Sequence, residues 1–165
     1  MTTPTVLTAE RLRELFNYNP STGIFTRLVS TNRGAKAGDV VGHTKSGRYV
    51  KVKIDGANYR IHRLAWLFVH GAWPTDHIDH INGNSFDNRI ENLRDVGRDL
   101  NMQNQRKARS DNKLGVLGVV RSFGGFRAEI KVCGKKRSLG TFQTPDQAHA
   151  AYLDAKRVLH PGNTL

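Results

Sequence analysis

A short run of polar residues near the middle of the chain has the types and spacing of a metal-assisted hydrolytic site. Asp79 and His80 are neighbours, and Asn101 follows 22 residues after Asp79. Carboxylate and amide oxygens are hard ligands that suit Mg²⁺. A histidine with an ordinary pKa of about 6.5 can take a proton from water at neutral pH. We therefore expect Asp79 and Asn101 to hold a divalent cation and His80 to act as general base.

These side chains meet only if the chain between them doubles back. Residues 77–105 predict the order strand, loop, strand, helix, and the loop over 82–88 is rich in Asn, Gly and Asp. Successive residues of a strand point to opposite faces. Asp79 and His80 can therefore approach one site only at a bulge or at the end of a strand.

Three further side chains near this run are candidates for the same site. Asn104 lies one helical turn beyond Asn101 and could ligate in its place. His77 precedes Asp79 by two residues on the same strand face, where it either packs or touches the phosphate or the metal. Arg63 either contacts phosphate or anchors the helix that follows it.

Charge divides the 165-residue chain into three parts. The whole chain has 26 Lys and Arg against 14 Asp and Glu, a net charge of +12. Residues 1–75 and 106–165 are basic, with balances of +7 and +8, whereas residues 76–105 have a balance of −3. A basic surface favours nucleic acid as the partner, with simple solubility as the alternative. Because carboxylates repel phosphates, the central acids indicate a bound cation, unless they are solvated turn and cap residues.

The composition excludes several classes of protein. Cys133 is the only cysteine, so we expect neither a disulfide framework nor a structural zinc site. No window approaches the roughly 18 apolar residues of a membrane span. Residues 1–10 lack the basic and then apolar pattern of a secretory leader. We therefore expect a soluble cytoplasmic protein that has no contact with a membrane.

The first 75 residues predict a small mixed α/β scaffold. Residues 7–16 have the apolar spacing of a short amphipathic helix, and residues 24–28 resemble a strand. Residues 49–61 alternate apolar and basic side chains around a glycine turn, which predicts a hairpin. Residues 63–69 predict a second short helix.

The last third of the chain predicts three strands and a helix. Residues 116–121, 126–132 and 136–142 alternate as strands and are separated by glycine turns, which indicates an antiparallel meander. Thr144 suits the N-cap of a helix that reaches about residue 159, with Gln147 in the capping-box position. The fold class is therefore α+β. We expect a domain over 1–105 with its catalytic core at about 76–105, a linker over 106–113 and a second domain over 114–165.

The central pattern resembles the HNH endonuclease family, and most of all its phage and homing-type members, whose fold is the ββα-metal motif. The resemblance covers roughly residues 60–105. The matching segments, in order, are His62-Arg63-Leu64-Ala65-Trp66, Asp79-His80, Asn82-Gly83-Asn84, Asp87-Asn88-Arg89, Glu91-Asn92-Leu93-Arg94 and Asn101. The resemblance implies that His80 is the general base and that Asp79 and Asn101 hold Mg²⁺ or Mn²⁺. It also implies that Asn92 ties down the loop and orients the base.

This resemblance implies hydrolysis of double-stranded DNA to 5′-phosphate and 3′-hydroxyl ends. It suggests a homing-type nuclease of bacteriophage or mobile-element origin that acts in the cytoplasm of the host cell. One active site per chain cuts one strand, so a double-strand break would need two chains or two successive events. Both a monomer and a homodimer are consistent with the sequence. The alternatives are a DNA-binding regulator with an inactive HNH fold, and an RNA-binding protein or ribonuclease.

Residues 112–160 are similar to the Apetala-type (ethylene-response-factor) DNA-binding domain. The matching segments are Gly118-Val119, Phe126-Arg127-Ala128-Glu129-Ile130, Leu139-Gly140-Thr141-Phe142 and Ala148-His149-Ala150-Ala151-Tyr152. The resemblance implies a three-stranded sheet in the major groove with a helix behind it. The basic candidates for DNA contact are Arg121, Arg127, Lys131, Lys135 and Arg137. Each of them either reads a base, with Arg127 as first choice, or contacts phosphate alone.

Overall fold

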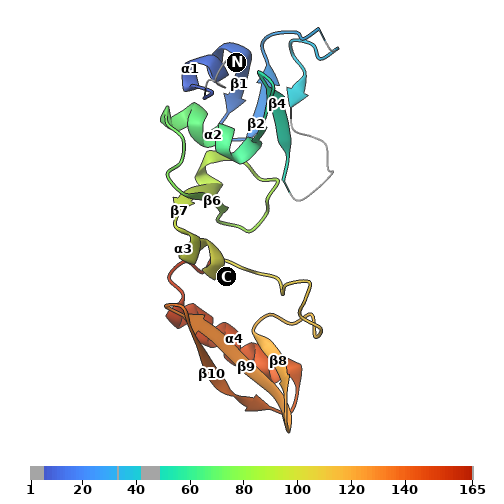
Figure 1. The fold of residues 1–165 in the computed structure, drawn as a ribbon, viewed down its shortest axis with the longest axis vertical. Coiled ribbons are helices and arrows are strands. Elements are labelled where there is room, and N and C mark those ends of the chain that lie inside the picture. Colours follow the sequence, from blue (N-terminus) through green and yellow to red (C-terminus); the bar gives the residue numbers. More distant parts are fainter. Residues whose placement is uncertain (1–5, 33, 42–48, 165) are drawn as a thin grey trace, which may run out of the picture. The chain divides into compact units, whose positions relative to one another are not determined.

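The computed structural model of the protein describes residues 6–32, 34–41 and 49–164. Residues 1–5, which enter the expectation about a leader, lie outside the described residues. The chain divides into two compact units, Met1–Val96 and Gly97–Leu165 (Figure 1). A separate apolar core fills each unit, so each unit is described by itself.

The first unit is built from short helices and small antiparallel sheets. Its elements are α1 (Ala9–Leu15), β1 (Phe16–Asn19), β2 (Ile24–Arg27), β3 (Val40–Val41), β4 (Lys51–Ile54), β5 (Ala57–Arg60), α2 (Ile61–His70), β6 (His77–His80), the 3-10 turn η1 (Ile90–Asn92) and β7 (Leu93–Val96). The sheets are β1-β2-β3, β4-β5 and β6-β7. The strand, hairpin and helix predicted at 24–28, 49–61 and 63–69 are all present, and β1 and β3 are additional.

The first helix is shorter than the predicted range of 7–16. Thr8 caps it by accepting a hydrogen bond from Arg11 N at 3.2 Å. Phe16 leaves the helix because it starts β1 and pairs with β2. Its buried ring meets Phe25 edge to face, with the centroids 6.3 Å apart. Packing of this ring in the core overrides its fit to the helical pattern.

One face of α2 completes the core of the first unit. Ile61, Leu64, Ala65 and Leu67 of this helix are buried, and α1 packs against it. The helix ends at Gly71, which has the left-handed backbone that favours glycine, with φ 73°. The scaffold before β6 is therefore held by apolar packing.

In the second unit a three-stranded sheet packs on one long helix. Its elements are α3 (Arg98–Gln103), β8 (Val119–Ser122), β9 (Gly125–Val132), β10 (Lys135–Phe142) and α4 (Pro145–Leu159). The sheet has the antiparallel order β10-β9-β8, and α4 lies along one of its faces (Figure 1). This confirms the α+β fold class with a C-terminal sheet on one helix.

The sequence signals for α4 are met in the structure. Thr144 Oγ1 accepts from Gln147 N, and Gln147 Oε1 accepts from Thr144 N, both at 3.3 Å. The helix lies so close to the sheet edge that a Cβ on Gly118 would come within 2.1 Å of the Tyr152 ring. Gly118 also has φ 76°, so the close packing requires glycine there.

The short helix α3 belongs to the second unit and is tied to the C-terminal tail. Gly162 N donates to Gln103 Oε1 at 2.9 Å. The buried Lys156 donates to the Gln105 carbonyl at 2.5 Å. Among the helices of the described residues, none is long and apolar enough to cross a membrane.

Candidate functional site

The β6–β7 hairpin places Asp79 in an ion pair that is largely shielded from water. The register pairs Asp79 with Arg94 and His80 with Leu93. Cross-strand partners share a face, and Arg94 Nη2 and Nε donate to Asp79 Oδ2 at 2.8 and 3.0 Å. The Asp79 side chain is only 9% exposed. His80 is the last residue of β6, which is the strand end that the sequence required.

The His80 ring contacts Asn88 from the loop that follows. His80 Nε2 lies 3.2 Å from Asn88 Oδ1, and both residues are buried. The amide orientation is fixed because Asn88 Nδ2 donates to the Phe86 carbonyl at 3.3 Å. Since Oδ1 can only accept, His80 Nε2 is the donor and the neutral ring has its lone pair on Nδ1. Sequence reasoning gave Asn88 no role, although the matching Asp87-Asn88-Arg89 segment could have drawn attention to it.

Asn92 ties down the loop between β6 and β7. Its Oδ1 accepts from Asn82 N at 2.9 Å, and its Nδ2 donates to the Asp87 carbonyl at 2.8 Å. The residue is buried, so these two bonds replace water for both loop groups. Asn92 therefore holds the loop, whereas the amide that contacts the His80 ring is that of Asn88.

A second buried histidine, His62 on α2, packs against His80. The two rings meet edge to face with centroids 5.2 Å apart, and the Tyr49 ring lies 5.1 Å from His62. Burial lowers the pKa of His62 to about 3, and the charges of Arg60, Arg63 and a protonated His80 act in the same direction. His62 is therefore neutral at pH 7.

Burial also lowers the pKa of His80 from its ordinary value of 6.5. The hydrogen bond to Asn88 and the charges of Asp79 and Asp87 oppose this change without reversing it. The imidazole is therefore neutral at pH 7 and able to accept a proton.

Arginine neutralises part of the acidic segment. Arg89 Nη2 and Nε donate to the two carboxylate oxygens of Asp87 at 2.8 and 2.9 Å, and Nη1 donates to Glu91 at 2.7 Å. Arg89 lowers the pKa of Asp87 to about 2. Asp95 accepts from the main-chain nitrogens of residues 75 and 76. Several acids of residues 76–105 thus stabilise loops and turns, which is the alternative that the sequence left open.

This arrangement coincides with a known family pattern. Residues 59–103 match the family model described as HNH endonuclease. The matching segment contains Asp79, His80, Asn92 and Asn101. It supports an HNH nuclease domain in this part of the chain, and therefore a nuclease-type hydrolase that acts on nucleic acid. No curated protein and no solved structure matches the chain significantly.

HNH nucleases typically use a divalent metal, and the donor chemistry of the expected ligands fits a hard cation. Asp79 offers carboxylate oxygens and Asn101 an amide oxygen. Asn101 lies on α3 in the second unit, and its amide has no hydrogen-bond partner among the described residues. Asn104, the alternative, is buried and accepts a hydrogen bond from Thr164 Oγ1. The side-chain oxygen of Asn104 is therefore already engaged within the second unit.

A cation at the expected position would have few protein ligands. Within the ranges that the structure describes, no three His, Cys, Asp or Glu side chains gather as a metal site. An Asp and an Asn would leave the other positions of a Mg²⁺ shell to water and to phosphate oxygens, which is how Mg²⁺ is commonly bound.

The two expected phosphate contacts have different surroundings. Arg63 Nη1 donates to the Asp76 carbonyl at 3.0 Å, and its guanidinium lies 5.8 Å from the centre of the Trp73 ring. Arg63 therefore anchors the connection between α2 and β6. His77 is exposed at the start of β6, on the same strand as Asp79.

The C-terminal sheet divides its basic side chains between two faces. Arg127, Lys131 and Lys136 share the open face, because Lys136 pairs with Lys131 and because Ala128 and Ile130, which alternate with Arg127 and Lys131, are buried in the core. Glu129 lies among these cations. Its carboxylate is 2.6 Å from Arg127 Nη2 and 3.9 Å from Lys136 Nζ.

The other three basic candidates lie on the helix side of the sheet. Arg121, Lys135 and Arg137 pair with apolar residues of β9 and are exposed at the sheet margins. The two-residue turn Cys133-Gly134, with φ 48° and 77°, sets this register. Sequence analysis gave Lys136 no role. The position of this turn in the sequence could have shown that Lys136 lies on the open face.

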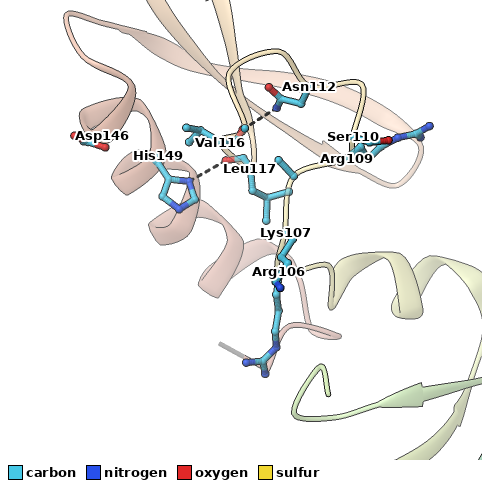
Figure 2. A pocket seen from close by; sticks show the side chains of 11 residues that line it. Arg106, Lys107, Arg109, Ser110, Asn112, Val116, Leu117, Asp146 and His149 are labelled. Carbon is cyan, nitrogen blue, oxygen red and sulfur yellow. Dashed lines mark hydrogen bonds between the residues drawn. The ribbon is translucent and has the colours of Figure 1, made fainter. Parts of the chain in front are cut away.

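A hollow of about 590 Å³ lies in the second unit beside α4 (Figure 2). Arg106, Lys107, Arg109 and His149 are among its lining residues. His149 Nδ1 donates to the Leu117 carbonyl at 2.8 Å, so this ring stabilises the fold. None of the residues predicted for the nuclease or DNA sites lines the hollow, so it is not the candidate site.

Proposed function

We propose that this protein is a metal-dependent DNA endonuclease that hydrolyses phosphodiester bonds with His80 as general base. The proposal is carried by one observation, a buried neutral imidazole held by Asn88 inside the segment that matches the HNH endonuclease family. Double-stranded DNA is the substrate, and the products have 5′-phosphate and 3′-hydroxyl ends, as the sequence resemblance implies.

His80 takes the proton of the attacking water at Nδ1. Its other nitrogen, Nε2, donates to Asn88 and therefore does not accept. Burial keeps the resting ring neutral by lowering its pKa. The imidazolium that forms during attack is stabilised by the negative charges of Asp79 and Asp87.

Asp79 and Asn101 are the residues that would hold the cation, Mg²⁺ or Mn²⁺. When bound, it supplies positive charge that stabilises the phosphate and the leaving 3′-oxygen. Arg94 orients the Asp79 carboxylate through two hydrogen bonds to one oxygen. Asn92 holds the adjoining loop, and the exposed His77 contacts the phosphate backbone.

The open face of the C-terminal sheet binds the DNA. A sheet of this kind fits the major groove. Arg127 is our first choice for a base contact, because Glu129 already restricts its guanidinium and less rotamer entropy is lost on binding. Lys131 and Lys136 contact phosphates on the same face. The remaining candidates, at the sheet margins, contact phosphates of the flanking backbone: Arg121, Lys135 and Arg137.

Cleavage of supercoiled plasmid tests the nuclease proposal. Wild-type protein with Mg²⁺ or Mn²⁺ should nick or linearise the plasmid, and EDTA should stop the reaction. His80→Ala should lower the rate by about 100-fold or more, as expected for loss of a general base. The control is Tyr59→Phe in the same unit. A His80→Ala protein that cuts as fast as the wild type would refute the base assignment.

The same assay distinguishes the second function that the sequence left open. A DNA-binding regulator with an inactive HNH fold would shift the plasmid in a gel and leave it intact with every divalent metal. A parallel assay on single-stranded and duplex RNA separates a ribonuclease from a deoxyribonuclease. Phage or mobile-element origin, homing activity and a place in the cytoplasm stay proposals that rest on the sequence resemblance and composition.

A further inference from the structure

We propose that the turn between β1 and β2 is a positioning element for His80 and acts through the main chain of Asn88, an inference that rests on the proposed role of His80 as base. Tyr18, on β1, donates its hydroxyl to the Asn88 carbonyl at 2.7 Å. Both residues are buried. A short bond between buried groups restrains the main chain from which the Asn88 amide projects toward His80.

The Tyr18 phenol is a dependable donor. Burial, helped by the charge of Asp87, raises the pKa of Tyr18 to about 12. The hydroxyl therefore keeps its proton throughout the pH range of a nuclease assay. The ring is also fixed, because it packs on Phe25 and Phe68 with centroid distances of 4.6 and 5.7 Å.

Gly23 brings the turn against the same carbonyl group of Asn88 and against the peptide nitrogen that follows it. It has φ 73°, and a Cβ there would lie 2.5 Å from Asn88 C and 2.6 Å from Arg89 N. Next to it the Pro20 carbonyl accepts a hydrogen bond from Ile90 N at 3.1 Å. Strand β1 and the turn therefore contact the main chain at Asn88 and at the two residues that follow it.

This contact determines which nitrogen of His80 has the proton. The Asn88 amide is shared between the Phe86 carbonyl and His80 Nε2. A displaced Asn88 would withdraw the acceptor from Nε2, and hydrogen bonds weaken steeply with poor geometry. The ring could then place its proton on Nδ1, where it would block acceptance of a proton from water. The chemical step would slow, whereas DNA binding would not change.

Two substitutions test the turn, and each has a matched control. Tyr18→Phe removes the hydroxyl and keeps the packed ring, and Tyr59→Phe makes the same change on a ring that stacks on Trp73. Gly23→Ala places a methyl group against Asn88. Gly56→Ala adds one at φ 87° in another hairpin turn, where a Cβ meets nothing within 4 Å.

The tests use the full chain, with nitrogen-15 NMR of the His80 ring and steady-state cleavage of a labelled duplex. Tyr18→Phe and Gly23→Ala should convert His80 from mainly Nε2–H to a mixture of tautomers. Each should lower kcat by about tenfold at unchanged KM, the scale of a small misplacement in an active site. Tyr59→Phe and Gly56→Ala should leave both the tautomer and kcat unchanged.

The outcomes separate this inference from the proposed function. If Tyr18→Phe and Gly23→Ala keep the wild-type tautomer and kcat, the turn does not position His80. If they alter kcat no more than their controls while the tautomer changes, the turn holds the ring but has no part in the reaction, which overturns the positioning role. If the tautomer changes and His80→Ala cuts at the wild-type rate, the turn still positions the ring and the base assignment fails.

Discussion

Both units bury polar side chains, but they use them differently. The buried polar residues of the first unit lie on α2, on β6 and in the loop after it: His62, Asp79, His80, Asn88 and Asn92. Those of the second unit lie near α3, α4 and the C-terminal tail: Asn104, Lys156 and His160. In the first unit His80 contacts both His62 and Asn88, and in the second each side chain reaches a distant segment.

The groups that these buried side chains contact explain the difference between the two units. Lys156 donates to the Gln105 carbonyl, and His160 Nε2 donates to the Lys131 carbonyl at 2.9 Å, so both connect distant parts of the main chain. His62 and His80 instead pack ring against ring and are neutral because they are buried. Buried titratable groups that face one another reduce stability. Their presence in the first unit agrees with the proposed role of His80 as base, whereas the second unit uses polar burial to join segments.

The largest expected effect is a loss of stability of the first unit in acid. Unfolded His62 takes up a proton near pH 6.5, but folded His62 does so only near pH 3. The unfolded state therefore binds more protons between these values, and stability falls as the pH falls through this window. Each pH unit should cost up to about 1.4 kcal/mol from this residue. Urea unfolding between pH 7 and 4.5 measures the slope.

Tryptophan fluorescence reports this unit alone, because Trp66 and Trp73 are the only tryptophans and both precede residue 96. His62→Phe keeps a ring against Tyr49 and removes the titration. It should flatten the pH dependence of the free energy of unfolding. An unchanged slope in His62→Phe would show that His62 is already protonated in the folded unit.

A smaller loss of stability is expected when a loop asparagine is replaced, and one asparagine from each unit can be compared. Asn92→Ala removes a buried side chain that bonds the Asn82 nitrogen and the Asp87 carbonyl, and should cost about 2–3 kcal/mol of stability. Asn112 also bonds two backbone groups, since it donates to the Val116 carbonyl at 2.8 Å and accepts from Leu114 N at 2.9 Å.

Asn112 is partly exposed, so water can replace its bonds, and Asn112→Ala should cost only about 1 kcal/mol. Denaturant unfolding followed by fluorescence for the first unit and by circular dichroism for the whole chain gives both values. Equal losses of unfolding free energy in Asn92→Ala and Asn112→Ala would mean that the burial of the asparagine does not determine the cost.

The smallest effect concerns the two faces of the C-terminal sheet. Arg127→Ala, on the open face, should weaken DNA binding by about five- to tenfold at moderate salt and make the salt dependence shallower. Lys135→Ala, on the helix side, removes only the proposed contact with a flanking phosphate and should weaken binding less, by about two- to threefold. Fluorescence anisotropy with EDTA present measures binding without cleavage.

Glu129→Gln should change DNA affinity in the opposite direction to Arg127→Ala. It removes a carboxylate that lies beside Arg127 and Lys136, so DNA binding should become a few-fold tighter and more dependent on salt. Equal weakening by Arg127→Ala and Lys135→Ala would show that the open face has no special part in binding.

Most elements could be predicted from the sequence, because their signals are local. The capping box at Thr144 and Gln147 sets the start of α4, and glycine turns separate the strands of the meander. The helix predicted over 7–16 was three residues too long: Thr8 is the N-cap of α1, and Phe16 fits a helical stripe but starts β1. The two residues of β3 have too little sequence of their own to predict a strand.

The site could be predicted in part. The spacing of Asp79, His80 and Asn101 identified the segment that matches the HNH endonuclease family. It could not identify Asn88 as the partner of His80, because Asn88 and Asn92 are both loop asparagines at plausible distances along the chain. Only the folded loop decides which amide reaches the ring.

The sequence by itself determined the chemistry available to this protein, since the types of side chain and their order do not depend on the fold. The tertiary structure decided which contacts those side chains make. It holds Asp79 with Arg94 across the hairpin, places Asn88 against His80 and brings Tyr18 to Asn88 across 70 residues of chain. Such contacts form between segments distant in sequence, and burial then changes the pKa values on which the proposed reaction depends.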